Sequence, residues 1–204
     1  PHLASSAASD VYKRQHQLQN LFQVPVYKGH LEQDFKIPDL WSGLSKNVWS
    51  GESGFSTAQC DLQLHDSSVE VCDVIEALFP HVIEYWNTLG YAPAQIRPTA
   101  SWANWHEVGD HTSEHSHCDG TRQTHIASVY YIEKGEGGDI ELINPLDYIH
   151  RLTPLAGEQG DMLMSESIKC VSGDFLLFPG WLRHRTQITQ SPRKALSINF
   201  NGYL

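Results

Sequence analysis

A succession of short apolar runs, separated by turn residues, fills the second half of this 204-residue chain. From Ile96 onward Gly, Pro, Asn and Asp interrupt the runs, and these residues favour turns over long elements. Eight strands are predicted, over 96–107, 125–133, 138–143, 160–164, 168–172, 174–178, 184–189 and 194–201. Strands of this number and length are typical of a jelly roll, in which two antiparallel sheets face each other. We therefore expect a mainly β fold.

One helix is expected before these strands, from Ser67 to Gly90. Its apolar residues recur at helical spacing, at Cys72, Ile75, Phe79, Val82, Trp86 and Leu89. The pattern Ser67-x-x-Glu70 predicts a capping box at its start, and Gly90 can supply the left-handed stop. Pro80 should kink the helix or split it. The apolar stripe predicts packing on the outer face of one sheet.

The remaining segments carry weaker signals. Residues 21–27 are predicted to form a short strand, at a sheet edge because of Pro25. Residues 36–60 show no clean period and are expected to be loop with a possible short helix that covers the functional site. The chain opens with Pro, and residues 3–15 resemble a translated library adapter. We expect residues 1–15 to be a non-native or disordered segment that replaces the true N-terminus, and 16–204 to form one domain with its core over about 96–201.

Composition narrows the classes of function. The formal net charge of −10 argues against a nucleic-acid partner, which requires a basic face for phosphate contacts. No apolar run approaches the ~20 residues that span a membrane. The four cysteines form no Cys-x-x-Cys pair, so the sequence predicts reduced thiols in a cytoplasmic protein.

The chemistry-bearing motif is His117-Cys118-Asp119, followed far downstream by His184. Side chains two apart in an extended segment share a face, so His117 and Asp119 can bind one ion together. Two imidazoles and a carboxylate form the facial triad that holds non-haem Fe(II) and leaves positions open. Arg193 lies nine residues after His184, and its guanidinium suits a bidentate grip on a carboxylate.

Further motifs follow in a fixed order. They are the run Thr124–Ile132 with its Tyr-Tyr pair, Gly137-Gly138-Asp139, Phe178-Pro179 ahead of His184, and Arg193-Lys194-Ala195-Leu196-Ser197-Ile198. In this order and spacing, over about 101–201, the chain resembles the core of the Fe(II)/2-oxoglutarate oxygenases. The similarity is to the prolyl-hydroxylase-like branch and to uncharacterised bacterial and phage proteins related to it.

The resemblance implies a double-stranded β-helix (jelly roll, cupin-like) with a flanking helix, and a dioxygenase that uses Fe(II), 2-oxoglutarate and O2. His117, Asp119 and His184 would be the metal ligands, and Arg193 would hold the distal carboxylate of 2-oxoglutarate. Tyr131 would assist Arg193. Many relatives carry a hydroxyl where this chain has Ala195, and Ser197 or Asn199 can replace that contact.

On the first long strand, Trp102, Asn104 and His106 alternate on one face, opposite Trp105. Asn104 is a candidate contact to the cosubstrate or substrate. Gly137 and Gly138 are expected to serve a turn.

The local histidines leave one alternative open. His115-Ser116-His117 is also an ion-binding spacing, so His115 could replace Asp119 or His117 as a ligand. We favour His117 and Asp119, because the carboxylate keeps the usual two-histidine set.

Two other functions compete with an oxygenase. One is a cupin-type metalloenzyme that uses no 2-oxo acid, against which Arg193 argues. The other is a non-catalytic jelly-roll module with a metal, although structural zinc normally has four protein ligands. The expected reaction is hydroxylation of a C–H bond in a small-molecule or peptidyl substrate, with release of succinate and CO2. Neither the substrate nor the oligomeric state is encoded in a readable motif, and an oligomer is possible.

Overall fold

The computed structural model describes residues 23–49, 52–118, 123–146 and 164–204. The expectations for residues 1–15, and nearly all of the predicted strand 160–164, fall outside these ranges. The position of Asp119 falls outside them as well.

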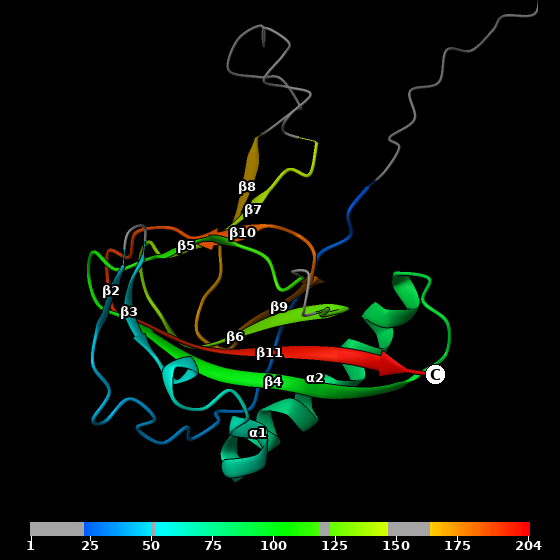
Figure 1. The fold of residues 1–204 in the computed structure, drawn as a ribbon, viewed down its shortest axis with the longest axis horizontal. Coiled ribbons are helices and arrows are strands. Elements are labelled where there is room, and N and C mark those ends of the chain that lie inside the picture. The colour runs from blue at the N-terminus through cyan, green and yellow to red at the C-terminus, as the bar shows by residue number, and fades with distance from the viewer. Residues whose placement is uncertain (1–22, 50–51, 119–122, 147–163) are drawn as a thin grey trace, which may run out of the picture.

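Two antiparallel sheets face each other (Figure 1). The larger has the order β1 (Tyr27–His30), β9 (Asp174–Pro179), β6 (Ile126–Lys134), β11 (Arg193–Tyr203), β4 (Gln95–His106), β3 (Glu52–Ser56) and β2 (Asn47–Trp49). The smaller has the order β5 (Thr112–His115), β10 (His184–Thr186), β7 (Ile140–Ile143) and β8 (Ser165–Ile168). This is the mainly β, jelly-roll arrangement expected from the sequence.

Strand alternation sorts the larger sheet into two faces. On β6, Tyr130 packs into the cluster under the helix, while its neighbour Tyr131 packs into the cluster between the sheets. On β11, Leu196 faces the helix and Ala195 faces the other sheet. Because the side-chain period of a strand is two, β4, β6 and β11 each present alternate residues to the space between the sheets. That space contains the candidate site.

The helix α2 (Val69–Thr88) covers the outer face of the larger sheet, as predicted (Figure 1). Its buried residues are Val71, Val74, Ile75, Leu78, Val82, Tyr85 and Trp86. The centre of the buried stripe therefore lies one residue before several of the predicted positions, and Cys72, Phe79 and Leu89 sit at its margin.

The ends of α2 test the capping prediction. The N-cap is Ser68, one residue after the predicted Ser67, and its Oγ accepts a hydrogen bond from Val71 N at 3.3 Å. Pro80 does not split the helix, which runs through it. Gly90 has φ 72°, so it provides the left-handed stop that was expected.

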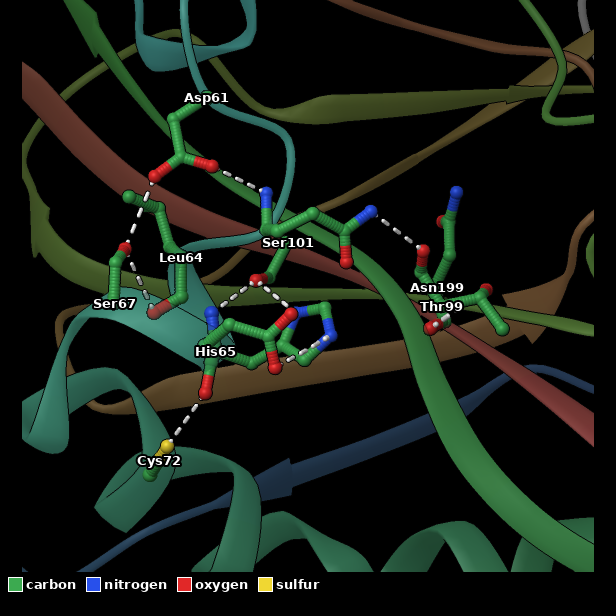
Figure 2. A network of polar contacts seen from close by, with 10 residues as sticks. Asp61, Leu64, His65, Ser67, Cys72, Thr99, Ser101 and Asn199 are labelled. Carbon is green, nitrogen blue, oxygen red and sulfur yellow. Dashed lines mark hydrogen bonds and ion pairs between the residues drawn. The ribbon is translucent and has the colours of Figure 1, made fainter.

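A polar network around the buried Ser101 attaches the short helix α1 (Leu64–Ser67) to β4 (Figure 2). Ser101 Oγ accepts from His65 N at 2.8 Å and lies 2.7 Å from His65 Nδ1. Ser101 is fully buried, which excludes it as an accessible nucleophile despite its histidine partner. Cys72 Sγ donates to His65 O, so α2 joins the same network. The network fixes β4 from outside the barrel.

Three predicted segments are wrong in position. The early strand is β1, after Pro25 rather than across it, although it does lie at a sheet edge. The segment 36–60 contains strands β2 and β3, which were not expected, and a short 3₁₀ helix, η1 (Thr57–Gln59), which agrees with the possible short helix. In place of the predicted strand 168–172, the chain forms β8 over Ser165–Ile168 and then turns at Gly173, where φ is 86°.

Strand β5 was not predicted at all. Its residues, Thr112–His115, are polar and carry no apolar alternation. They become a strand because β10 pairs with them, so the strand depends on a long-range partner.

The helices that the structure describes include none with the length and apolarity needed to cross a bilayer.

Candidate functional site

Three histidines meet at the end of the smaller sheet. His115 ends β5 and His184 begins β10, and the two are cross-strand partners with ring centroids 4.3 Å apart. His117 follows two residues later and is held by its backbone N–H, which donates to Gly180 O at 2.8 Å. One ligand atom from each imidazole lies within 4.8 Å of the other two.

The ring geometry fits a shared metal ion. Nε2 of His117 lies 3.2 Å from Nε2 of His184. Nδ1 of His184 lies 2.9 Å from Leu182 O, and Nδ1 of His115 lies 2.9 Å from Ser113 O. Backbone carbonyls therefore fix the Nδ1–H tautomer on both rings and leave Nε2 as the ligand atom, as metal-binding histidines require.

Burial keeps two of these rings neutral. It lowers the pKa of His184 well below its usual value, and neighbouring histidines act in the same direction. Burial, followed by His115, also lowers the pKa of His117 to about 4. Neutral imidazole is the form that coordinates a metal, so both rings are ready to bind near pH 7.

Asp119, the predicted carboxylate ligand, lies outside the described residues. The residues just before it are fixed: Cys118 Sγ donates to Thr124 O, and Ser116 Oγ donates to Cys118 O. Of the predicted triad, the structure describes His117 and His184, which lie close together with His115 beside them. The set His117, Asp119 and His184 stays a prediction, and so does the alternative with His115.

Arg193 is buried between the sheets, with 4% of its surface exposed. Its guanidinium carbon lies 5.1 Å from the centroid of the Tyr131 ring, and Nη1 lies 3.5 Å from His106 Nδ1. Nε of Arg193 and the hydroxyl of Tyr131 have no hydrogen-bond partner among the described residues. Buried polar groups are normally paired, so the two orphans indicate that an anion belongs here.

Two other cations of the sheets, Arg185 and Lys194, are already neutralised. Arg185 forms a bidentate ion pair with Glu141, at 2.7 and 2.9 Å. Lys194 pairs with Glu133 at 2.9 Å. By contrast, Arg193 has no carboxylate partner in the part of the chain that the structure describes. It is therefore the cation best placed to bind an incoming carboxylate.

The remaining predicted contacts also face inward. Nδ2 of Asn104 donates to Ser197 Oγ at 3.3 Å, joining β4 to β11 inside the barrel. Ala195 is fully buried beside them and brings no hydroxyl. Trp102, two residues before Asn104, stacks on His117 with ring centroids 5.5 Å apart. The face predicted by alternation, Trp102 with Asn104 and His106, thus lines the site.

One residue of the site received no role from the sequence. His106 is 3% exposed and contacts Arg193 on one side and Thr112 on the other. Gly54 makes room for it, because a Cβ built on that glycine would lie 2.4 Å from His106 Cδ2. The alternation that placed His106 beside Asn104 was the available signal.

Comparison with known proteins identifies the family. A family model described as putative 2OG-Fe(II) oxygenase matches residues 100–201, half of the chain. No protein of curated function matches the chain in sequence.

Solved structures share the fold at low identity. A prolyl-4-hydroxylase from Pseudomonas putida has 13% identity and a TM-score of 0.58, covering 89% of this chain and 94% of its own. A Trichoplax adhaerens prolyl hydroxylase, in complex with a hypoxia inducible factor peptide, has 13% identity and a TM-score of 0.53, covering 76% and 66%. HygX from Streptomyces hygroscopicus, with nickel, 2-oxoglutarate and hygromycin B, has 13% identity and a TM-score of 0.52, covering 78% and 74%. These likenesses confirm the double-stranded β-helix fold.

Proposed function

The chain belongs to the 2OG-Fe(II) oxygenase family and is a 2-oxoglutarate-dependent non-haem iron oxygenase, and we propose that it hydroxylates a C–H bond of a small-molecule or peptidyl substrate. Its cofactors are Fe(II), the cosubstrate 2-oxoglutarate and O2. When bound, they supply the oxidation: one oxygen atom of O2 enters the substrate, the other enters succinate, and CO2 is released.

The proposed metal ligands are His117, Asp119 and His184. The 3.2 Å between the Nε2 atoms of the two histidines supports binding of one ion by both. A carboxylate is the third ligand that the facial triad of non-haem iron requires. The backbone carbonyl bonded to Nδ1 of His184 would hold that ring in its ligand tautomer.

The observation that carries the proposal is the buried, uncompensated guanidinium of Arg193. A buried cation without an anion is costly, whereas a bidentate pair with a carboxylate relieves that cost. We assign it to the C5 carboxylate of 2-oxoglutarate. Burial raises the pKa of Tyr131, so its phenol stays protonated and can donate to the same carboxylate. Lys194 and Arg185 point to their own acidic partners instead.

Asn104 and Ser197 are proposed to border the cosubstrate. Ser197 is two residues beyond Ala195 on the inward face of β11, so its hydroxyl can replace the one that relatives carry nearer Arg193. The Asn104–Ser197 hydrogen bond would hold both side chains in place while 2-oxoglutarate binds.

The test is succinate formation from 2-oxoglutarate, measured with added Fe(II), first without substrate and then with a panel of peptides and small molecules. The proposal expects slow succinate formation that depends on Fe(II) and on Arg193. Oxidation of a substrate in the absence of 2-oxoglutarate would indicate the cupin-type alternative. Tight zinc binding with no turnover under any condition would indicate the non-catalytic module.

A further inference from the structure

The three clustered histidines differ in what holds their rings. Nδ1 of His184 lies 2.9 Å from Leu182 O, and Nδ1 of His115 lies 2.9 Å from Ser113 O. In the described part of the chain, no backbone carbonyl takes the same position at His117. A metal-ligating histidine almost always donates its second ring N–H to an acceptor. A side chain is therefore the candidate acceptor at His117.

Asn199 on β11 is placed to be that side chain. Its neighbours along the strand, Ile198 and Phe200, both pack in the cluster under the helix. Because successive side chains of a strand point to opposite faces, Asn199 points into the space between the sheets. There it lines the same cavity as His117.

The two side chains also interact. Burial and the neighbouring His115 lower the pKa of His117, and a hydrogen bond between its ring and the Asn199 side chain opposes them. Oδ1 of Asn199 is nevertheless buried, and it meets no donor with the alignment of a full hydrogen bond. Hydrogen bonds of a catalytic site are often poorly aligned before its ligands bind and tighten afterwards.

The ring of His117 is confined on another side by Trp102. The two rings are stacked, with their centroids 5.5 Å apart and an interplanar angle of 29°. The backbone N–H of His117 is fixed as well, since it donates to Gly180 O at 2.8 Å. What remains to be fixed is which ring nitrogen carries the proton, and an acceptor at Asn199 decides that.

We infer that Asn199 is the positioning residue of His117, with its Oδ1 accepting from Nδ1–H and so presenting Nε2 to the metal. The inference rests on the proposed function, because it needs His117 as a metal ligand. A neutral imidazole has one donor and one acceptor nitrogen, so a proton held at Nδ1 leaves the lone pair of Nε2 for the ion. An amide does this without adding a charge beside the site.

This role separates Asn199 from the cosubstrate. Asn199 lies six residues beyond Arg193 on β11, on the same face of the strand. The sequence left Ser197 and Asn199 as alternatives for a contact to 2-oxoglutarate. The interaction with His117 assigns Asn199 to the metal end of the site, and Ser197 is then the residue that borders the cosubstrate.

The first experiment measures Fe(II) affinity by anaerobic titration. Asn199→Leu removes the acceptor at similar volume and should raise the dissociation constant of Fe(II) at least roughly tenfold. Asn199→Asp keeps an acceptor oxygen and should bind Fe(II) at least as tightly as the wild type, because a carboxylate partner raises the basicity of the ligand. Thr99→Val is the matched control, since it removes the hydroxyl that donates to the backbone carbonyl of Asn199 and leaves the amide in place (Figure 2). Its affinity should not change.

The second experiment reads the tautomer of His117 directly, by NMR of the isotope-labelled imidazoles in the metal-free protein at about pH 7.5, where histidine is neutral. His117→Ala identifies the signal. The Nδ1–H form should dominate in the wild type, Asn199→Asp and Thr99→Val, and Asn199→Leu should give a mixture of both tautomers. If Asn199→Leu fails to fold, Asn199→Ala provides the same test with a smaller side chain.

Several results would overturn the role of Asn199. They are an unchanged tautomer or Fe(II) affinity in a folded variant without the acceptor, an equal loss of affinity in Asn199→Asp, or an equal loss in Thr99→Val. If the wild type still forms succinate with Fe(II) in such a case, the oxygenase proposal stands without this role. If the wild type neither binds Fe(II) nor forms succinate, the proposed function itself fails, and the tautomer measurement still decides whether Asn199 orients His117.

Discussion

Nδ1 of His106 lies 3.5 Å from Nη1 of Arg193, and both residues are at least 95% buried. Burial lowers the pKa of His106 to about 3, and the positive charge of Arg193 acts in the same direction. The ring is therefore neutral, and its Nδ1 can accept from the guanidinium. Its Nε2 lies 3.2 Å from Thr112 Oγ1, so His106 links the guanidinium on the larger sheet to β5 on the smaller.

His106 should position Arg193 for 2-oxoglutarate. His106→Leu removes the acceptor, and we expect the dissociation constant of 2-oxoglutarate to rise about tenfold, since hydrogen bonds to charged groups contribute ~1.5–3 kcal/mol. His106→Gln keeps an acceptor oxygen and should recover part of the affinity. The KM for 2-oxoglutarate should rise more than kcat falls. Equal affinity in both variants would assign His106 to packing alone.

Arg193 should carry most of the 2-oxoglutarate affinity. Arg193→Ala should weaken binding by at least roughly tenfold, and Arg193→Lys should restore it only in part, because the ammonium group lacks the fork geometry. The measurement is a titration of 2-oxoglutarate into the anaerobic Fe(II) protein, following the visible charge-transfer band. Arg185→Ala is the control, since Arg185 already binds Glu141. An unchanged dissociation constant of 2-oxoglutarate in Arg193→Ala would show that another residue binds its C5 carboxylate.

The identity of the third metal ligand can be decided by substitution. If the ligands are His117, Asp119 and His184, then Asp119→Ala and His184→Ala should each weaken Fe(II) binding roughly hundredfold or more, above the loss caused by outer-shell changes. His115→Ala should then have a much smaller effect. Metal content and a direct metal titration measure this. The reverse order for His115 and Asp119 would make the site a three-histidine centre.

The buried histidines should make the metal-free protein sensitive to acid. A histidine whose folded pKa is depressed binds fewer protons than in the unfolded chain, so its stabilising contribution is present above about pH 6.5 and is lost as pH falls. For His106 this loss extends from about 6.5 toward its folded value of about 3. As the pH is lowered from about 7.5 to about 4.5, the midpoint temperature of thermal unfolding should fall less steeply for His106→Gln than for the wild type. Parallel curves for both proteins would contradict a neutral buried His106.

The start of α2 offers a stability test. Ser68→Ala removes the side-chain cap on Val71 N and should lower the free energy of unfolding by ~1 kcal/mol. Ser67→Ala is the comparison, because it removes a hydroxyl that donates to Asp61 and leaves the cap on Val71 N intact. Chemical denaturation of both variants measures the difference. An unchanged free energy of unfolding in Ser68→Ala would contradict the cap at Ser68.

The sequence could predict much of the fold because local patterns encode it. The period-two alternation of Trp102, Asn104 and His106 is enough to assign one face of β4 to the interior. The helical period across 67–90 located α2 and its sheet-facing stripe, and Gly90 marked its end. These signals are strong because the side-chain period follows directly from backbone geometry.

Other elements depended on partners that local patterns do not reveal. Strand β5 is polar and forms only because β10 pairs with it, and the exact cap of α2 depends on which of two adjacent serines is left outside the helix. Residues 36–60 lack alternation, yet β3 pairs with β4 at Trp105 and Asn104. Tertiary pairing overrides weak propensity in such segments.

By itself, the sequence determined the class of fold, the family motifs and the residues His117, His184 and Arg193 as candidates for the site. Only the tertiary structure placed His184 against His115 through strand pairing. It also showed that Arg185 and Lys194 already have acidic partners, so neither is the best candidate to bind the cosubstrate. Arg193, by contrast, is buried and its Nε has no hydrogen-bond partner among the described residues. The physical reason is that periodicity fixes which face a side chain occupies. Which charges remain unpaired, and which cavities they face, depends on residues brought together from distant parts of the chain.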